Sequence, residues 1–205
     1  MYKTLIVDDH AAMCDSLAFA LEGTGDFTVV GKLPRADHAE MLCGKLSPDL
    51  VLMDVCTDED ASGLEAAKVI REKFPAIKIV VMSGFDEITY MPRAKEAGAH
   101  AFVYKSMSLE FFIEVARSVL QGNTCFPEAK TIPMPMGEAP LTEREMEVLM
   151  LMCRRMNSKE IAEELYISES TVRYHKSNML AKTGFTKAVD LAFYIISNGW
   201  INPKY

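Results

Sequence analysis

Short apolar runs alternate with amphipathic stretches through the first 122 residues of the chain. The apolar runs cover residues 4–9, 27–33, 50–54, 77–84 and 99–105. The stretches at 11–23, 34–45, 63–74, 92–97 and 109–122 carry apolar residues at helical spacing. Strands that are buried on both faces read as short apolar runs, and their alternation with helices indicates a parallel sheet. The pattern predicts an α/β domain with a doubly wound, five-stranded parallel sheet.

Two prolines bear on where helices begin. Pro34 follows the second apolar run directly and is predicted to start a helix. Pro92 would break a helix that started near Asp86, because proline is tolerated in the first turn of a helix but not in its interior. We therefore expect the fourth helix to begin near Pro92 and to end at Gly98.

The pattern changes after Gly122. Residues 123–140 contain four prolines and no helical period, which is typical of an extended linker. From Leu141 onward the apolar spacing is helical throughout and predicts four helices. The first three starts are marked by capping pairs, namely Thr142 with Glu145, Asn157 with Glu160, and Ser168 with Thr171.

The joint at residues 166–168 leaves room only for a sharp turn between the second and third of these helices, so a helix-turn-helix is expected. The predicted organisation is an α/β domain over residues 1–122, a linker over 123–140, and a smaller all-α domain over 141–205.

Composition and charge narrow the class of protein. The chain is 49% hydrophobic and 25% charged, as soluble globular proteins are. No apolar run approaches the roughly 18 residues of a membrane span, and the first run is too short for a signal peptide, so we expect a cytoplasmic protein without a membrane partner. The five cysteines are scattered without zinc spacing and are expected to be reduced.

The net charge of −7 is unevenly distributed. Residues 1–137 hold 13 Lys/Arg against 20 Asp/Glu, a difference of −7, whereas residues 138–205 hold 9 of each. A polyanion is therefore expected to bind the second part of the chain.

Polar side chains end four of the five predicted strands. Asp8 and Asp9 end the first, Asp54 the third, Ser83 the fourth and Lys105 the fifth. Parallel strands deliver their carboxyl ends to one edge of a sheet, so these side chains are expected to meet. Three carboxylates repel one another unless a cation neutralises them, and Mg²⁺ prefers such oxygen ligands. An ammonium opposite a hydroxyl beside that metal would hold a phosphoryl group.

This constellation resembles the receiver domain of two-component response regulators, over residues 3 to about 121. The resemblance implies a flavodoxin-like fold in which Asp54 accepts a phosphoryl group from a sensor histidine kinase. It implies that Mg²⁺ is bound by Asp9, Asp54 and the carbonyl of Cys56, with Asp8 supporting the metal through water.

The resemblance also implies roles for three residues around the phosphoryl group. Lys105 would bind a phosphoryl oxygen, and Ser83 would follow the group inward. Phe102, three residues before Lys105, matches the aromatic switch position of the family.

The loop after Asp54 departs from the family pattern. The family usually has proline four positions after the phosphoacceptor, where this chain has Asp58, and Glu59 and Asp60 add two further carboxylates. These charges could strengthen Mg²⁺ binding or oppose the incoming phosphoryl group, and the sequence leaves both alternatives open.

The helical domain resembles the LuxR-type DNA-binding domain of NarL/FixJ response regulators, over residues 141 to about 200. The resemblance implies that the third helix of the domain lies in the major groove of double-stranded DNA. Base edges would be contacted by Arg173, Tyr174 and Ser177. Phosphates would be contacted by Lys176, Lys182, Thr186 and Lys187. Arg155 stands where the family commonly has glycine, which bears on how the first helix of the domain ends.

These residues are compatible with three functions. The first is a transcription regulator that is switched by Mg²⁺-dependent phosphorylation, acts as a homodimer on DNA and has RNA polymerase as a further candidate partner. The second is an aspartate-dependent phosphohydrolase of the haloacid dehalogenase type, but that family has a DxD nucleophile motif on its first strand and no DNA-binding domain. The third is a receiver controlled by a partner or small ligand instead of phosphorylation.

Overall fold

The computed structural model describes residues 1–85, 88–128 and 140–201, with the side chain of Asp60 outside the description. The described residues divide into two compact units, one over 1–85 and 90–128 and the other over 88–89 and 140–201. None of the helices in the described part of the chain is both long enough and apolar enough to cross a bilayer.

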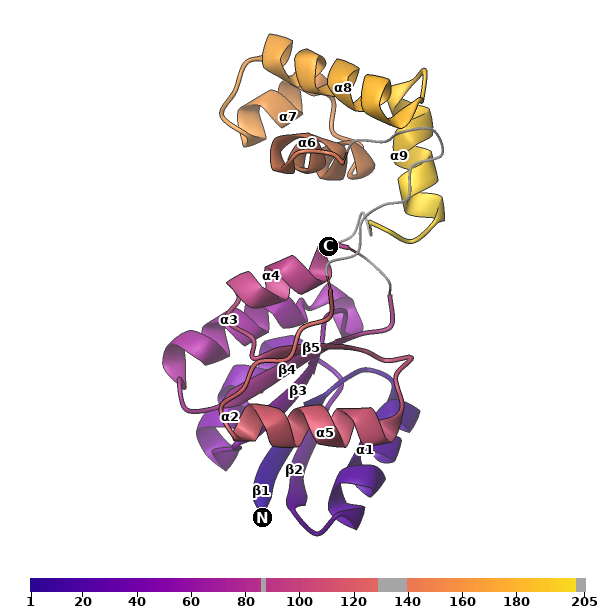
Figure 1. The fold of residues 1–205 in the computed structure, drawn as a ribbon. Coiled ribbons are helices and arrows are strands. Elements are labelled where there is room, and N and C mark those ends of the chain that lie inside the picture. The colour runs from indigo at the N-terminus through magenta and orange to yellow at the C-terminus, as the bar shows by residue number, and fades with distance from the viewer. Residues whose placement is uncertain (86–87, 129–139, 202–205) are drawn as a thin grey trace. The chain divides into compact units, whose positions relative to one another are not determined.

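The first unit is a five-stranded parallel sheet with helices on both faces (Figure 1). Its strands lie in the order β2-β1-β3-β4-β5, with the bounds β1 Tyr2–Val7, β2 Phe27–Leu33, β3 Leu50–Asp54, β4 Lys78–Ser83 and β5 Ala101–Tyr104. Its α-helices are α1 Ala11–Gly23, α2 Ala39–Leu46, α3 Gly63–Lys73, α4 Tyr90–Glu96 and α5 Leu109–Leu120. This strand order is the flavodoxin-like one, so the predicted fold class is confirmed.

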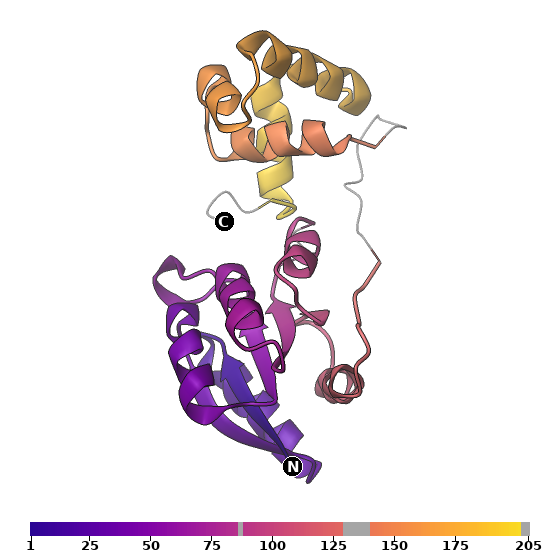
Figure 2. The same cartoon turned by 90° about the vertical axis from the view of Figure 1, so that its left-hand side faces the viewer.

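Helices α1 and α5 pack together on one face of the sheet, and α2, α3 and α4 cover the other (Figure 2). Side chains alternate between the two faces along each strand. The core between the sheet and the first helix pair includes Ile6, Leu52, Val80 and Val103 from four neighbouring strands. Burial of these apolar side chains fixes the register of the sheet, and thereby the edge to which each strand delivers its last residue.

Two predicted helix starts have different outcomes. The fourth helix, α4, begins at Tyr90, so Pro92 lies in its first turn as expected. Pro34 does not start a helix: a short 3₁₀ turn, η1, covers Ala36–His38, and α2 begins only at Ala39. The reason lies in tertiary bonds, because the carbonyl of Pro34 accepts a hydrogen bond from the Asp58 N–H at 3.2 Å.

Residues 123–128, which the sequence assigns to the linker, lie in the first unit. Cys125 N–H donates to the carbonyl of His100 at 3.0 Å, and Phe102 N–H donates to the carbonyl of Cys125 at 3.0 Å. The segment therefore pairs in parallel with the edge strand β5 at Ala101. Residues 129–139 of the predicted linker are outside the described residues.

The second unit contains the four predicted helices, namely α6 Glu143–Cys153, α7 Ser158–Glu164, α8 Glu169–Thr183 and α9 Ala188–Ser197. The capping pairs at Thr142 and Asn157 are complete capping boxes, and the Ser168 hydroxyl caps α8. One core joins all four helices, with fully buried residues such as Leu149, Ile161, Val172 and Leu191. The turn between α7 and α8 makes the pair a helix-turn-helix, as predicted.

Candidate functional site

Two buried carboxylates and one ammonium meet at the edge of the sheet that receives the carboxyl ends of the strands. Asp54 is the last residue of β3, Asp8 follows β1, and Lys105 follows β5. The Lys105 Nζ lies 2.8 Å from Asp8 Oδ2 and 2.8 Å from Asp54 Oδ2. The side chains of Asp8 and Asp54 are 0% and 4% exposed. The structure thus brings together three residues that the sequence placed at separate strand ends.

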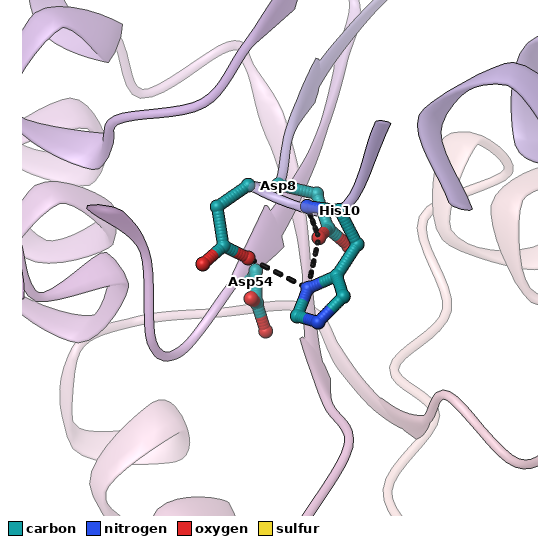
Figure 3. A group of neighbouring side chains, drawn as sticks. Asp8, His10 and Asp54 are labelled. Carbon is teal, nitrogen blue, oxygen red and sulfur yellow. Dashed lines mark hydrogen bonds and ion pairs between the residues drawn. The ribbon is translucent and has the colours of Figure 1, made fainter. Parts of the chain in front are cut away.

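A potential metal-binding cluster at this edge combines Asp8, Asp9, His10 and Asp54, whose ligand atoms all lie within 4.8 Å of one another. Figure 3 shows the side chains of Asp8, His10 and Asp54 gathered there. The His10 Nδ1 lies 2.7 Å from Asp9 Oδ1, and the His10 N–H donates to Asp8 Oδ1 at 2.9 Å. His10 is not among the site residues predicted from the sequence, although its place directly after the acid pair is a signal for it.

The donor set fits a hard divalent cation. Asp8 Oδ2 lies 2.8 Å from Lys105 Nζ, and Asp9 Oδ1 lies 2.7 Å from His10 Nδ1. The carboxylates of Asp8, Asp9 and Asp54 outnumber the one ammonium that contacts them, and Mg²⁺, which prefers oxygen ligands, would neutralise the remaining charge. The Cys56 Sγ lies 3.4 Å from the Tyr90 hydroxyl, and the role implied for the Cys56 carbonyl stays a prediction.

Burial sets the protonation of the pocket. It raises the pKa of Asp54 to about 7; the Lys105 ammonium lowers that pKa, and the charges of Asp8 and Asp9 raise it. Burial by itself would lower the pKa of Lys105, but its contacts with Asp54 and Asp8 outweigh burial and raise it. The single ammonium leaves the pocket with an excess of negative charge, so a bound cation would favour an ionised Asp54.

The two predicted switch residues lie on β4 and β5. Ser83 is buried at the end of β4, and its hydroxyl both accepts from the Phe85 N–H and donates to the Phe85 carbonyl at 3.0 Å. Phe102 is buried in β5 and packs edge-on against Tyr104, with ring centroids 5.2 Å apart. The Ser83 hydroxyl is therefore held by its own loop, and its predicted move toward a phosphoryl group would require those two bonds to break.

The start of α3 packs against the backbone of the phosphoacceptor position. A Cβ on Gly63 would lie 1.8 Å from the carbonyl oxygen of Asp54, a distance at which no side chain fits. The Gly63 N–H also donates to the carbonyl of Val55 at 2.9 Å. Glycine at this position therefore allows the close approach that holds the end of β3 in place.

The acidic loop after Asp54 is bonded to the segment that follows β2. The Thr57 hydroxyl accepts a hydrogen bond from the Ala36 N–H at 3.0 Å and donates to the carbonyl of Ala61 at 2.7 Å. Arg35 pairs with Glu59, and both Asp58 and Glu59 are exposed. Neither residue belongs to the carboxylate cluster among the described side chains, so neither acts on Asp54 at contact distance.

The second unit exposes most of its predicted DNA-binding residues. Arg173, Tyr174 and Ser177 are exposed on α8, and Thr186 and Lys187 are exposed between α8 and α9. The Arg173 guanidinium lies 3.5 Å from the Glu169 carboxylate, one helical turn earlier.

Two of the predicted phosphate contacts are bonded within the unit. Lys176 Nζ donates to the Ser158 hydroxyl at 3.0 Å. Lys182 Nζ donates to Glu145 Oε2 at 2.7 Å, and the Glu145 side chain is 3% exposed. The DNA contact of Lys182 stays a prediction, and that contact would compete with this ion pair. The sequence predicts Glu145 only as a capping residue and does not predict that it is buried.

The first domain is flavodoxin-like and holds a buried aspartate beside an acid pair and a lysine. The same chain carries a helix-turn-helix domain, and this combination defines a DNA-binding response regulator. Comparison with known proteins gives the same class. The family model of the response regulator receiver domain matches residues 4–117, and that of the bacterial regulatory proteins of the luxR family matches residues 139–195. The chain belongs to the two-component response regulators with a LuxR-type DNA-binding domain.

Relatives match over nearly the whole chain. The transcriptional regulatory protein LnrK of Bacillus subtilis is 30% identical over 217 aligned residues, covering 97% of this chain and 98% of LnrK. The response regulator protein VraR of Staphylococcus aureus is 32% identical, covering 93% of this chain and 96% of VraR. The structure of RcsB from Salmonella enterica serovar Typhimurium, bound to promoter rprA with phosphomimetic BeF3⁻, has a TM-score of 0.65 at 22% identity and covers 96% of this chain and 99% of RcsB.

Proposed function

We propose that Asp54 accepts a phosphoryl group from the phosphohistidine of a sensor histidine kinase, in a Mg²⁺-dependent reaction, and that this changes the affinity of the second unit for DNA. The observation that carries the proposal is the position of Lys105 Nζ, 2.8 Å from both Asp8 and Asp54 in a pocket with excess negative charge. In such a pocket the ammonium can bind phosphoryl oxygens, and a divalent cation that binds with the phosphoryl group can neutralise the carboxylates.

In the transfer, Asp54 Oδ attacks phosphorus while the bond from phosphorus to the histidine nitrogen breaks. The released imidazole nitrogen takes a proton from solvent, and Lys105 stabilises the charge on the phosphoryl oxygens. Asp9, Asp54 and the Cys56 carbonyl would hold Mg²⁺, with Asp8 supporting it through water, and the ion would supply further charge neutralisation.

Phosphorylation of Asp54 would then change the conformation of residues outside the pocket. A phosphoryl oxygen near Ser83 would compete for the hydroxyl that Phe85 now holds, and Phe102 would repack beside it. Such a switch works because phosphorylation stabilises one of two arrangements more than the other.

On DNA, Arg173, Tyr174 and Ser177 would read base edges. The phosphate contacts would be Lys176, Lys182, Thr186 and Lys187. The second unit has equal numbers of acids and bases, so one copy offers little net electrostatic attraction, and two copies on paired half-sites would gain affinity through effective concentration. The RcsB dimers that are known bound to DNA support a homodimer as the DNA-binding form, with RNA polymerase as a further candidate partner.

Intact-mass measurement after treatment with a small phosphodonor and Mg²⁺ tests the proposal. The wild-type protein should gain one phosphoryl group, and Asp54→Asn should gain none. Asp9→Asn should gain little at the same Mg²⁺ concentration, because the pocket would lose a cation ligand. Labelling that persists in Asp54→Asn would refute the assignment.

A further inference from the structure

Arg155 occupies a backbone conformation that suits glycine. Helix α6 ends with the Arg155 N–H donating to the Met152 carbonyl at 2.9 Å and the Met156 N–H donating to the Leu151 carbonyl at 3.1 Å. This ending needs a left-handed residue, and Arg155 has φ 64°. Glycine adopts this conformation without steric cost, whereas a residue with a Cβ is disfavoured there. Arginine at this position therefore costs stability that glycine would not.

The charge of Arg155 is not neutralised by the described part of the unit. Most other cations of the unit lie near a carboxylate, namely Arg144 near Glu147, Lys159 near Glu163, Arg173 near Glu169 and Lys182 near Glu145. Among the described residues, Arg155 has no such partner, and it is exposed. Arg155 shares both properties with Lys187, a predicted phosphate contact. Its five N–H donors are thus available to a ligand from outside the unit.

The loop that carries Arg155 leads directly into α7, and the first residue of α7 is bonded to the predicted recognition helix. Two residues further on, Asn157 caps α7, and Ser158 accepts a hydrogen bond from Lys176 of α8 at 3.0 Å. The loop between α6 and α7 therefore adjoins a side chain that is itself a predicted phosphate contact. Arginine matches phosphate oxygens with paired N–H donors, which makes a phosphodiester the fitting ligand.

We propose that Arg155 binds the phosphodiester backbone of duplex DNA and extends the DNA-binding surface from α8 onto the loop between α6 and α7. The inference rests on the proposed DNA-binding role of α8 and adds a contact outside that helix. A contact of this kind carries affinity without reading sequence.

The test compares Arg155→Gly and Arg155→Lys with the wild type in the full-length protein, on one duplex of arbitrary sequence and on one selected from bound genomic fragments. Arg155→Gly should unfold at an equal or higher urea concentration, since glycine relieves the backbone. Its DNA affinity should nevertheless fall about eightfold at 0.1 M salt on both duplexes, and its salt slope should drop by about 0.9, as expected for one phosphate contact. Arg155→Lys keeps the charge and should retain the slope.

Opposite effects on stability and DNA affinity cannot come from unfolding, so they would support the contact. An Arg155→Gly variant that binds both duplexes with wild-type affinity and slope would overturn the inference while leaving the DNA-binding role of α8 intact. A loss of affinity in Arg155→Gly on the selected duplex alone would also overturn it, because a backbone contact acts on every sequence. Wild-type protein without salt-dependent DNA binding would overturn both the inference and the proposed function.

Discussion

Replacing Lys182 with methionine should destabilise the second unit more than replacing Glu145 with glutamine, although both changes break the same ion pair. The two atoms of the pair, Lys182 Nζ and Glu145 Oε2, lie 2.7 Å apart. At an effective dielectric of about 20 their attraction is about 6 kcal/mol, and desolvation of the two charges offsets most of it. The stability lost on removing one partner depends on which charge stays unpaired, because the Glu145 side chain is 3% exposed and the Lys182 side chain is 28% exposed.

In Lys182→Met the buried carboxylate keeps the Thr142 N–H, which donates to it at 2.8 Å, but loses its counter-ion. The expected loss is about 3 kcal/mol, at the lower end for a broken buried pair. In Glu145→Gln the amide oxygen can still accept from Thr142, and the Lys182 ammonium can turn to water. That loss should be about 1 kcal/mol.

The same pair gives a pH dependence. Burial would raise the pKa of Glu145, but the Lys182 ammonium and the bonds to Thr142 outweigh burial and lower it below 4.5. The wild-type pair therefore contributes stability that is present above pH 4.5 and is lost as the pH falls through the folded-state pKa. Without Lys182, burial dominates and favours the protonated acid. The deficit of Lys182→Met should thus be largest near pH 7 and should shrink toward pH 4.

Urea unfolding of the fragment 138–205 at pH 7 and pH 4.5, at one temperature and salt concentration, measures these differences. Lys159→Met is the matched control, since its pair with Glu163 spans 4.0 Å on the surface and should contribute almost nothing. The reasoning is refuted if Glu145→Gln costs as much as Lys182→Met, or if the deficit of Lys182→Met does not change with pH.

Two further predictions concern the receiver domain. In Gly63→Ala the new Cβ would lie 1.8 Å from the Asp54 carbonyl oxygen, so the Asp54 backbone would have to move. The variant should lose about 2–3 kcal/mol of stability in urea unfolding and should take up no phosphoryl group in intact-mass measurement. Phosphoryl uptake at the wild-type level would contradict this. Burial, with the charges of Lys78 and Arg71, lowers the pKa of His100 to about 4, so receiver stability should fall as the pH drops from 6.5 to 4. His100→Asn should reduce the loss of stability between pH 6.5 and pH 4 by up to roughly 3 kcal/mol. The asparagine side-chain oxygen can still accept the hydrogen bond from the Ile79 N–H. A pH profile of stability equal to that of the wild type would refute the role of His100.

Much of the fold follows from local patterns. The strand that ends at Asp54, the late start of α4 just before Pro92 and the capping boxes of α6 and α7 each depend on residues close in sequence, and each is present. The gathering of Asp8, Asp54 and Lys105 was predictable as well, since parallel strands share one edge.

The features that sequence reasoning missed depend on distant residues. Pro34 does not start a helix, because its carbonyl accepts from Asp58, 24 residues away in the chain. Lys182 was predicted as a phosphate contact, but it pairs with Glu145, which lies 37 residues earlier in the chain. Cys125 pairs with β5 although its segment has no strand pattern of its own, because an edge strand offers unpaired backbone groups to any neighbouring segment.

The affinity of the full-length protein for a selected DNA duplex, before and after phosphoryl transfer to Asp54 and at one salt concentration, tests the central claim most directly. The phosphorylated protein should bind more tightly than the unphosphorylated protein, Asp54→Asn should not respond to the phosphodonor, and the fragment 138–205 should bind without phosphorylation. Equal affinity of the fragment and of the full-length protein in both states would contradict control of DNA binding by the receiver through Asp54.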